Sequence, residues 1–175
     1  KGRGYDPMSP LTSIDAKIDV TAVEYQKVTY SDLRATARLD SGKVDATVVS
    51  MNRDADFDLA LTGELGKDAY AAQFTGNVRN LDLMGLKMSP SMSKGSFIIE
   101  GSGKMLPRQN VIDADVAVTS LKWDMPDMSL ATPRVDASLA SDDSTMTVKL
   151  TNESLNTILI AACPLDSFMT RVTNT

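Results

Sequence analysis

The chain has 175 residues, of which 42% are hydrophobic, and a formal net charge of −5. These values predict one folded domain or one segment of a longer protein. The absence of His removes the usual general base and the commonest metal ligand, and the negative charge argues against a nucleic-acid partner. We therefore expect no catalytic site, no metal site, no cofactor and no enzyme activity.

The first 13 residues are predicted to be coil, because Gly and Pro punctuate them. They lack an initiating Met, and we interpret them as the cut end of a longer chain. No apolar run approaches the roughly 20 residues that span a bilayer, and no apolar leader opens the sequence. Residues 14–162 are predicted to form one repetitive antiparallel β domain, and residues 163–175 a short C-terminal helix and tail.

Apolar and polar residues alternate through residues 14–22 and 33–48. This period of two is typical of strands with one buried face. Ser41-Gly42 interrupts the second run and predicts a hairpin turn. The alternation resumes at residues 55–61 and 70–78, with a turn predicted from Gly63 to Asp68.

The Asp residues at the start of this next run invite comparison with a calcium loop. In Asp54-Ala-Asp56-Phe-Asp58, however, Leu59 stands where the loop requires Gly. We interpret the three carboxylates as the outward face of a strand.

A Met/Ser/Pro loop is predicted at residues 88–93, followed by strands in SFIIEGSG, VIDADVAVTSLKW and PRVDASLASDDSTMTVKL. The segment Gly101-Ser-Gly103-Lys104 lacks the spacing of a phosphate-binding loop, and we predict a turn there. Trp123 is interpreted as a packing anchor rather than a platform for a ligand.

The last apolar segment, LNTILIAACPLDSFMTRV, predicts a strand to about Ala162 and then a short helix with Pro164 in its first turn. Cys163 is the single cysteine, so no internal disulfide is possible. Ile160-Ala-Ala-Cys163 is spelled like a lipoprotein signal, but it lies far from an N-terminal leader. A buried thiol is the preferred interpretation.

The hairpin-like pattern recurs 100 residues further along the chain. The matching residues are Arg34 and Arg134, Ala37 and Ala137, Leu39 and Leu139, Thr47 and Thr147, and Val48 and Val148. This weak repeat favours an architecture of stacked, similar hairpins.

The inward positions are occupied by unusually small residues, Ala above all. The predicted inward residues are Ile14, Ala16, Ile18, Val20, Leu33, Ala35, Ala37, Leu39, Val44, Ala46, Val48, Phe57, Leu59, Leu61, Tyr70, Ala72, Phe74, Val135, Ala137 and Leu139. Small residues can leave room for a ligand, or they can pack tightly in a closed sandwich. The sequence leaves both open.

The cadence VTYSDLRATARLDSGKVDAT, together with NVRNLDLMGLKM and GSFIIEGSGKM, resembles the repeating unit of AsmA-like and TamB-like envelope proteins. The resemblance extends from about Ile14 to Leu150. It implies an elongated, curved antiparallel β-sheet built from repeated hairpins, forming an open trough or β-taco. The inward residues given above would line its apolar groove.

The same resemblance implies a bridge-like lipid transfer protein of the periplasm, anchored in the inner membrane by a segment outside this sequence. Its partners would be phospholipid acyl chains, an outer-membrane barrel protein and neighbouring repeats of the same chain. Lipid would move between the inner and outer membranes, and the TamB branch of this resemblance also implies support of outer-membrane assembly. The competing interpretation is a structural or adhesive β-module with a dry core.

Overall fold

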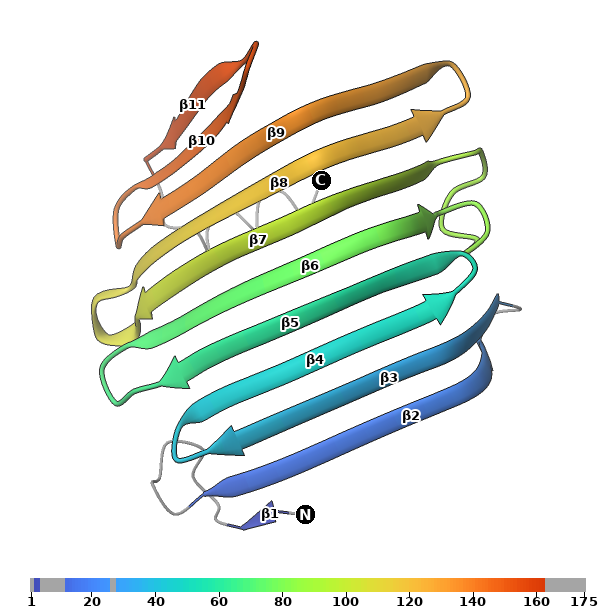
Figure 1. Cartoon of the computed structure of the whole chain (residues 1–175). Coiled ribbons are helices and arrows are strands. Elements are labelled where there is room, and N and C mark those ends of the chain that lie inside the picture. Colours follow the sequence, from blue (N-terminus) through green and yellow to red (C-terminus); the bar gives the residue numbers. More distant parts are fainter. Residues whose placement is uncertain (1, 4–11, 26–27, 163–175) are drawn as a thin grey trace.

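The computed structural model describes residues 2–3, 12–25 and 28–162, and in this range the fold is all-β. Eleven strands form one antiparallel sheet in the order of the sequence (Figure 1). The strands are β1 (Gly2–Arg3), β2 (Ser13–Tyr25), β3 (Val28–Asp40), β4 (Lys43–Asn52), β5 (Ala55–Leu65), β6 (Tyr70–Asp82), β7 (Lys94–Leu106), β8 (Val111–Met125), β9 (Met128–Ser141), β10 (Met146–Asn152) and β11 (Asn156–Ala161). The predicted all-β antiparallel class is confirmed.

Helical structure in the described residues is limited to one 3₁₀ turn, Pro107–Gln109, between β7 and β8. Among these residues, no helix has the length and apolarity that a membrane crossing requires. The predicted C-terminal helix at residues 163–175, with Cys163 and Pro164, lies outside the described residues.

The turn between β3 and β4 is the predicted Ser41-Gly42 hairpin. Both residues have positive φ, 53° and 82°, as a two-residue turn of this type requires. Glycine is needed at position 42, because a Cβ there would lie 2.9 Å from the backbone oxygen of Leu65. The local sequence thus fixes the register of the hairpin.

The predicted turn from Gly63 to Asp68 begins too early. Gly63 lies within β5, where it pairs with Val44 and Ala72. The chain reverses at residues 66–69, where the N–H of Gly66 donates to the carbonyl of Ala69 at 2.9 Å. Gly63 therefore belongs to the strand that the turn follows.

The turn predicted at Gly101 to Lys104 is also wrong, because these residues lie within β7. A Cβ on Gly101 would lie 2.5 Å from Cζ of Phe74, so the Phe74 ring lies over this glycine. Glycine in a strand interior commonly accommodates an aromatic ring from the neighbouring strand. Gly101 is therefore a site of packing.

Trp123 packs in the same way over Gly95, where a Cβ would lie 2.1 Å from Cε3 of the indole ring. Its Nε1–H donates to Oγ of Ser93 at 3.1 Å. These contacts support the interpretation of Trp123 as a packing anchor. They also attach the loop at residues 83–93 to β8.

The weak repeat does not extend to strand pairing. Leu39 pairs with Val44 across the short Ser41-Gly42 turn, whereas Leu139 pairs with Val148 across a longer turn. The two hairpins therefore have different registers, although their first strands align in sequence.

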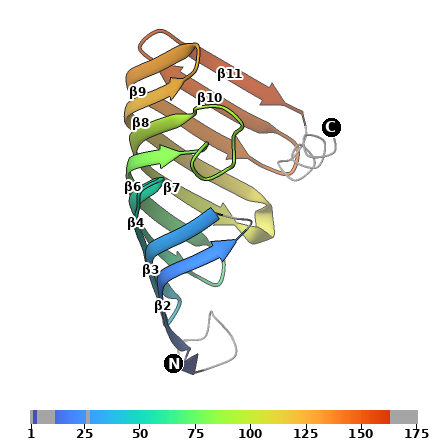
Figure 2. The ribbon, with the colours of Figure 1, turned by 90° about the vertical axis from the view of Figure 1, so that its right-hand side faces the viewer.

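The sheet is bent, and the loop between β6 and β7 lies on the inner side of the bend (Figure 2). Few apolar side chains of the described residues are buried: Val78, Leu86, Ala117 and Met146. A sheet normally buries one face against a second layer. Here most of the sheet has no such layer in the described part of the chain.

We expect Gly101→Ala to destabilise the fold by about 1–3 kcal/mol, because the added methyl group would clash with the Phe74 ring and with the backbone oxygen of Asp115. The matched control is Gly103→Ala in the same strand, where a Cβ would meet its nearest neighbour at 3.6 Å. Urea unfolding followed by circular dichroism measures both. Equal losses in the two variants would contradict this account of Gly101.

The turn between β9 and β10 depends on the Asp142 carboxylate. Its Oδ1 accepts the backbone N–H groups of Ser144 and Thr145, both at 2.8 Å, and the Ser144 hydroxyl at 2.9 Å. These bonds lower the pKa of Asp142 to about 2, and the bond from the Ser144 N–H has the largest effect. The ionised form therefore stabilises the turn.

This lowered pKa predicts a pH-dependent effect of Asp142→Asn. A group with a depressed pKa stabilises the fold above its unfolded pKa, 3.8, and loses that contribution as the pH falls through about 2. The urea midpoint of the wild type should exceed that of the variant at pH 6, and the difference should shrink between pH 4 and pH 2. A difference that stays constant would contradict the role of the carboxylate.

Candidate functional site

The strand register sorts the side chains into an apolar face and a polar face. We define the apolar face by three rows of paired residues that cross the sheet. The first row is Ile14, Leu39, Val44, Gly63, Ala72, Gly103, Ala114, Leu139, Val148 and Leu159. The second row is Ala16, Ala37, Ala46, Leu61, Phe74, Gly101, Val116, Ala137, Leu150 and Thr157. The third row is Ile18, Ala35, Val48, Leu59, Gly76, Ile99, Val118, Val135 and Asn152.

All of the predicted inward residues lie on this one face. Most belong to the three rows, and Val20, Leu33 and Phe57 belong to a fourth row beside them. Tyr70 lies on the same face beside the first row, on the side away from the fourth row, and pairs with Leu65 and Met105. No charged residue interrupts the three rows.

β7 and β8 supply a part of this face that was not predicted from the sequence. Ile99, Val116 and Val118 occupy the rows there, beside Gly101 and Gly103. The alternation in VIDADVAV was a usable signal for Val116 and Val118. The glycines carried no such signal, because their place on the face depends on the strand pairing.

Large side chains on the apolar face remain open to solvent. Ile14 is 41% exposed and Ile18 56%, while Leu59 and Leu61 are each 38% exposed. Extended apolar patches on a protein surface mark sites that bind a ligand, a membrane or another protein. The apolar face is therefore the candidate site.

Ion pairs cover the opposite, polar face. Nε of Arg34 on β3 lies 2.8 Å from the Asp19 carboxylate on β2. Lys17 and Arg34 hydrogen-bond to that carboxylate and lower the pKa of Asp19. Charged pairs of this kind keep the polar face hydrated.

Asp56 and Asp58 lie on the polar face of β5, where Arg79 of β6 binds both carboxylates. This pairing supports the interpretation of the two residues as the outward face of a strand. Asp54 differs, because it lies in the turn between β4 and β5. Within the described ranges, no group of three or more acidic or Cys side chains could hold a metal ion.

A hollow of about 520 Å³ lies on the polar face of β6 to β10. Its wall includes Glu100, Asp115 and the ion pair between Arg134 and Asp136. An acyl chain placed there would desolvate these charges, which is unfavourable. The hollow is thus unsuited to an apolar ligand.

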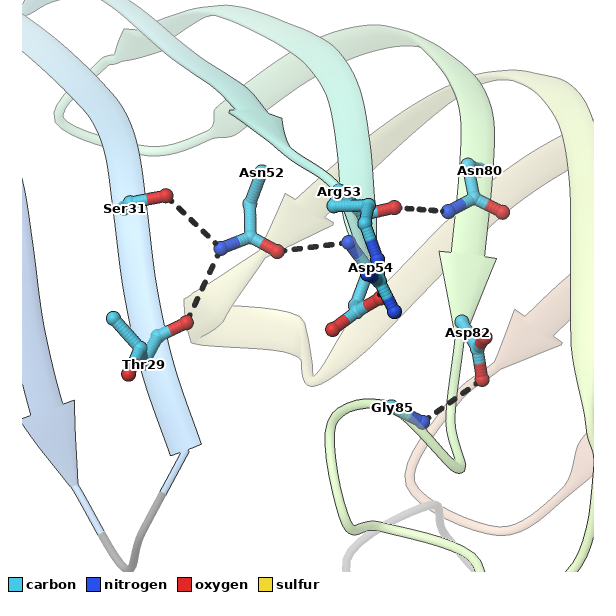
Figure 3. Close-up of polar contacts among 8 residues, drawn as sticks. All are labelled: Thr29, Ser31, Asn52, Arg53, Asp54, Asn80, Asp82 and Gly85. Atoms are coloured by element: carbon cyan, nitrogen blue, oxygen red, sulfur yellow. Dashed lines mark hydrogen bonds and ion pairs between the residues drawn. The ribbon is translucent and has the colours of Figure 1, made fainter.

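A polar cluster fixes the strand ends at one edge of the apolar face (Figure 3). The Asn52 amide donates to the Thr29 carbonyl at 3.2 Å, and its Oδ1 accepts the N–H of Asp54 at 2.8 Å. The Asp82 carboxylate accepts the N–H of Gly85 at 2.9 Å. These bonds hold the β4–β5 turn and the start of the loop at residues 83–93. Leu86 in this loop is buried.

Comparison of the chain with models of protein families, with curated proteins and with solved structures found no match. The resemblance to AsmA-like and TamB-like proteins stays a prediction from the sequence. The geometry of the two faces therefore carries the functional inference.

We expect the folded protein to enhance the fluorescence of 8-anilinonaphthalene-1-sulfonate, because the apolar face is uncovered. Leu61→Gln should lower this signal, since Leu61 lies in the second row. Thr62→Gln, one residue further on and on the polar face, is the matched control. Titration of the dye at neutral pH distinguishes the variants, and equal binding by both would contradict the assignment of the faces.

Proposed function

We propose that this chain is a non-enzymatic segment of a bridge-like lipid transfer protein. In this proposal the bent sheet is one wall of an open trough, and its apolar face carries phospholipid acyl chains. The observation that carries the proposal is the set of uninterrupted apolar rows from β2 towards β11. Burial of a lipid tail on such a surface gains about 0.8 kcal/mol per CH₂ group.

The direction of the rows suits movement of a lipid along the sheet. The rows run across the strands, and a strand spacing of about 4.8 Å gives a path of about 43 Å from β2 to β11. An acyl chain of one leaflet spans about 15 Å, half of the hydrocarbon core. Because the rows carry no charge, a chain can slide along them without desolvating an ion.

The small residues keep the surface of this path smooth, because their side chains project little from the sheet. Ala16, Ala37 and Ala46 are adjacent in the second row across β2, β3 and β4. Further along the same row, the Phe74 ring lies over Gly101. A ring that lies over a glycine fills the space of the missing side chain, so the surface stays continuous where the residues become larger.

Headgroups would project from the open side of the trough into water, while the ion pairs of the polar face would keep the outer surface hydrated. We place the parent protein in the periplasm, anchored in the inner membrane, with transfer between the inner and outer membranes. Neighbouring repeats and an outer-membrane barrel protein are its proposed partners. These assignments depend on the resemblance to the AsmA-like and TamB-like proteins.

A charge in the second row should remove bound lipid. We expect Ala46→Glu to lower the phospholipid that co-purifies with the chain by at least about tenfold, because a carboxylate would be desolvated against the tail. Thr47→Glu adds the same charge on the polar face and should keep the lipid. Native mass spectrometry with lipid extraction measures both, and circular dichroism checks the fold.

Ala37→Trp is a second test, since the bulky ring would project from the surface of the path without adding a charge. Unchanged lipid occupancy in both Ala37→Trp and Ala46→Glu would overturn the proposal. A lipid-free wild-type chain that unfolds cooperatively would instead favour the dry structural or adhesive module. The loop at residues 83–93 lies on the inner side of the bend and contains the buried Leu86, which favours that alternative (Figure 2).

A further inference from the structure

β11 differs from every other described strand, because none of its residues is charged. Ile158 and Ile160 pair with Lys149 and Thr147 on the polar face, whereas Leu159 pairs with Val148 on the apolar face. The three side chains are 55%, 68% and 49% exposed, in that order. A strand that is apolar on both faces is typical of a position inside a sheet, covered on both sides.

The outer edge of β11 offers backbone groups for pairing. The N–H of Asn152 donates to the carbonyl of Leu155 at 2.8 Å and closes the turn before β11. Hydrogen-bonded and non-hydrogen-bonded pairs alternate along an antiparallel ladder. The backbone groups of Leu159 therefore point towards β10, and those of Ile158 and Ile160 point outwards.

The opposite edge of the sheet carries the usual protection against such pairing. β2 presents Asp15, Lys17 and Asp19 along its length, and β1 pairs with its first residues. Charged residues on edge strands prevent edge-to-edge association. Because β11 has none, its edge is suited to accept a further strand.

We propose that β11 pairs antiparallel with β11 of a second copy of this chain, centred on Leu159. Ile158 then forms a hydrogen-bonded pair with Ile160 of the partner subunit, and the reverse pair forms by symmetry. Both of these pairs use the backbone groups of Ile158 and Ile160 that point outwards. Leu159 meets Leu159 of the partner subunit on the apolar face, while the isoleucines of both copies gather on the polar face.

A second copy fits this edge because the pairing is self-complementary. Centring on Leu159 places all three apolar residues against apolar residues of the same strand, and the two-fold axis closes the assembly. The first row also continues across the axis, from Val148 and Leu159 of one copy to the same residues of the other. This pairing concerns the β11 edge of this chain by itself and does not depend on lipid; in a longer parent protein a neighbouring repeat would compete for the same edge.

Disulfide trapping tests the register directly in the full chain with Cys163→Ser. The two residues at position 159 form a non-hydrogen-bonded pair, with Cα atoms about 4.5 Å apart, which is within the range of a disulfide. Leu159→Cys should therefore give a covalent dimer on mild oxidation. Thr157→Cys should not, because the two positions would lie about 14 Å apart along the strands. The double variant Thr157→Cys with Ala161→Cys should cross-link again.

Sedimentation of the lipid-free chain tests the association itself. Ile160→Lys should weaken dimerisation at least about tenfold, because it places a charge in an apolar contact on each side of the axis. The control is Ile98→Lys, an exposed polar-face position of β7 that should leave dimerisation unchanged. A wild-type chain that stays monomeric at its highest workable concentration, or cross-linking of Thr157→Cys equal to that of Leu159→Cys, would overturn the proposal. Either result would leave the lipid measurements on the apolar face unaffected.

Discussion

Cross-strand register is the constraint on which the rest of this molecule depends. Successive side chains of a strand point to opposite faces, so a slip of one residue would move the whole apolar set of that strand to the polar face. Nine strands in succession, β2 to β10, keep the three rows on one face. The hairpin at Ser41-Gly42 shows how a turn maintains this order, because its backbone geometry permits only one register.

Irregularities in the ladder lie away from the rows. The register shifts between β5 and β6, β6 and β7, and β7 and β8 all occur near the strand ends next to the loop at residues 83–93. Positive φ at Asp32 and Ser120 marks similar interruptions in β3 and β8. Such irregularities bend a strand and increase its twist. The sheet can therefore bend at one end while its central positions keep an unbroken apolar surface.

Local patterns predicted strands and their faces where apolar and polar residues alternate. Alternation placed Ala37 and Leu61 on one face, and Ser41-Gly42 gave a turn by its own backbone preferences. Gly63 and Gly101 were misassigned to turns because a glycine in sequence does not reveal what lies over it. The Phe74 ring that needs Gly101 comes from another strand, 27 positions away (101 − 74) in the sequence. For the same reason, the repeat around Leu39 and Leu139 could not predict their different pairing partners.

The exposed apolar surface and the exposed edge follow from the same architecture. A single sheet buries little apolar surface by itself. Each uncovered apolar surface is therefore stabilised by contact with another layer, a ligand or a second chain. The apolar face is broad, continuous and without charge, which suits a ligand held by contact area alone. The edge of β11 instead offers directed backbone groups together with Ile158 and Ile160 on the polar face, where a lipid tail would lie among ion pairs. Directed hydrogen bonds favour a strand there, and since Leu159 continues the first row, a paired strand would lengthen the apolar face.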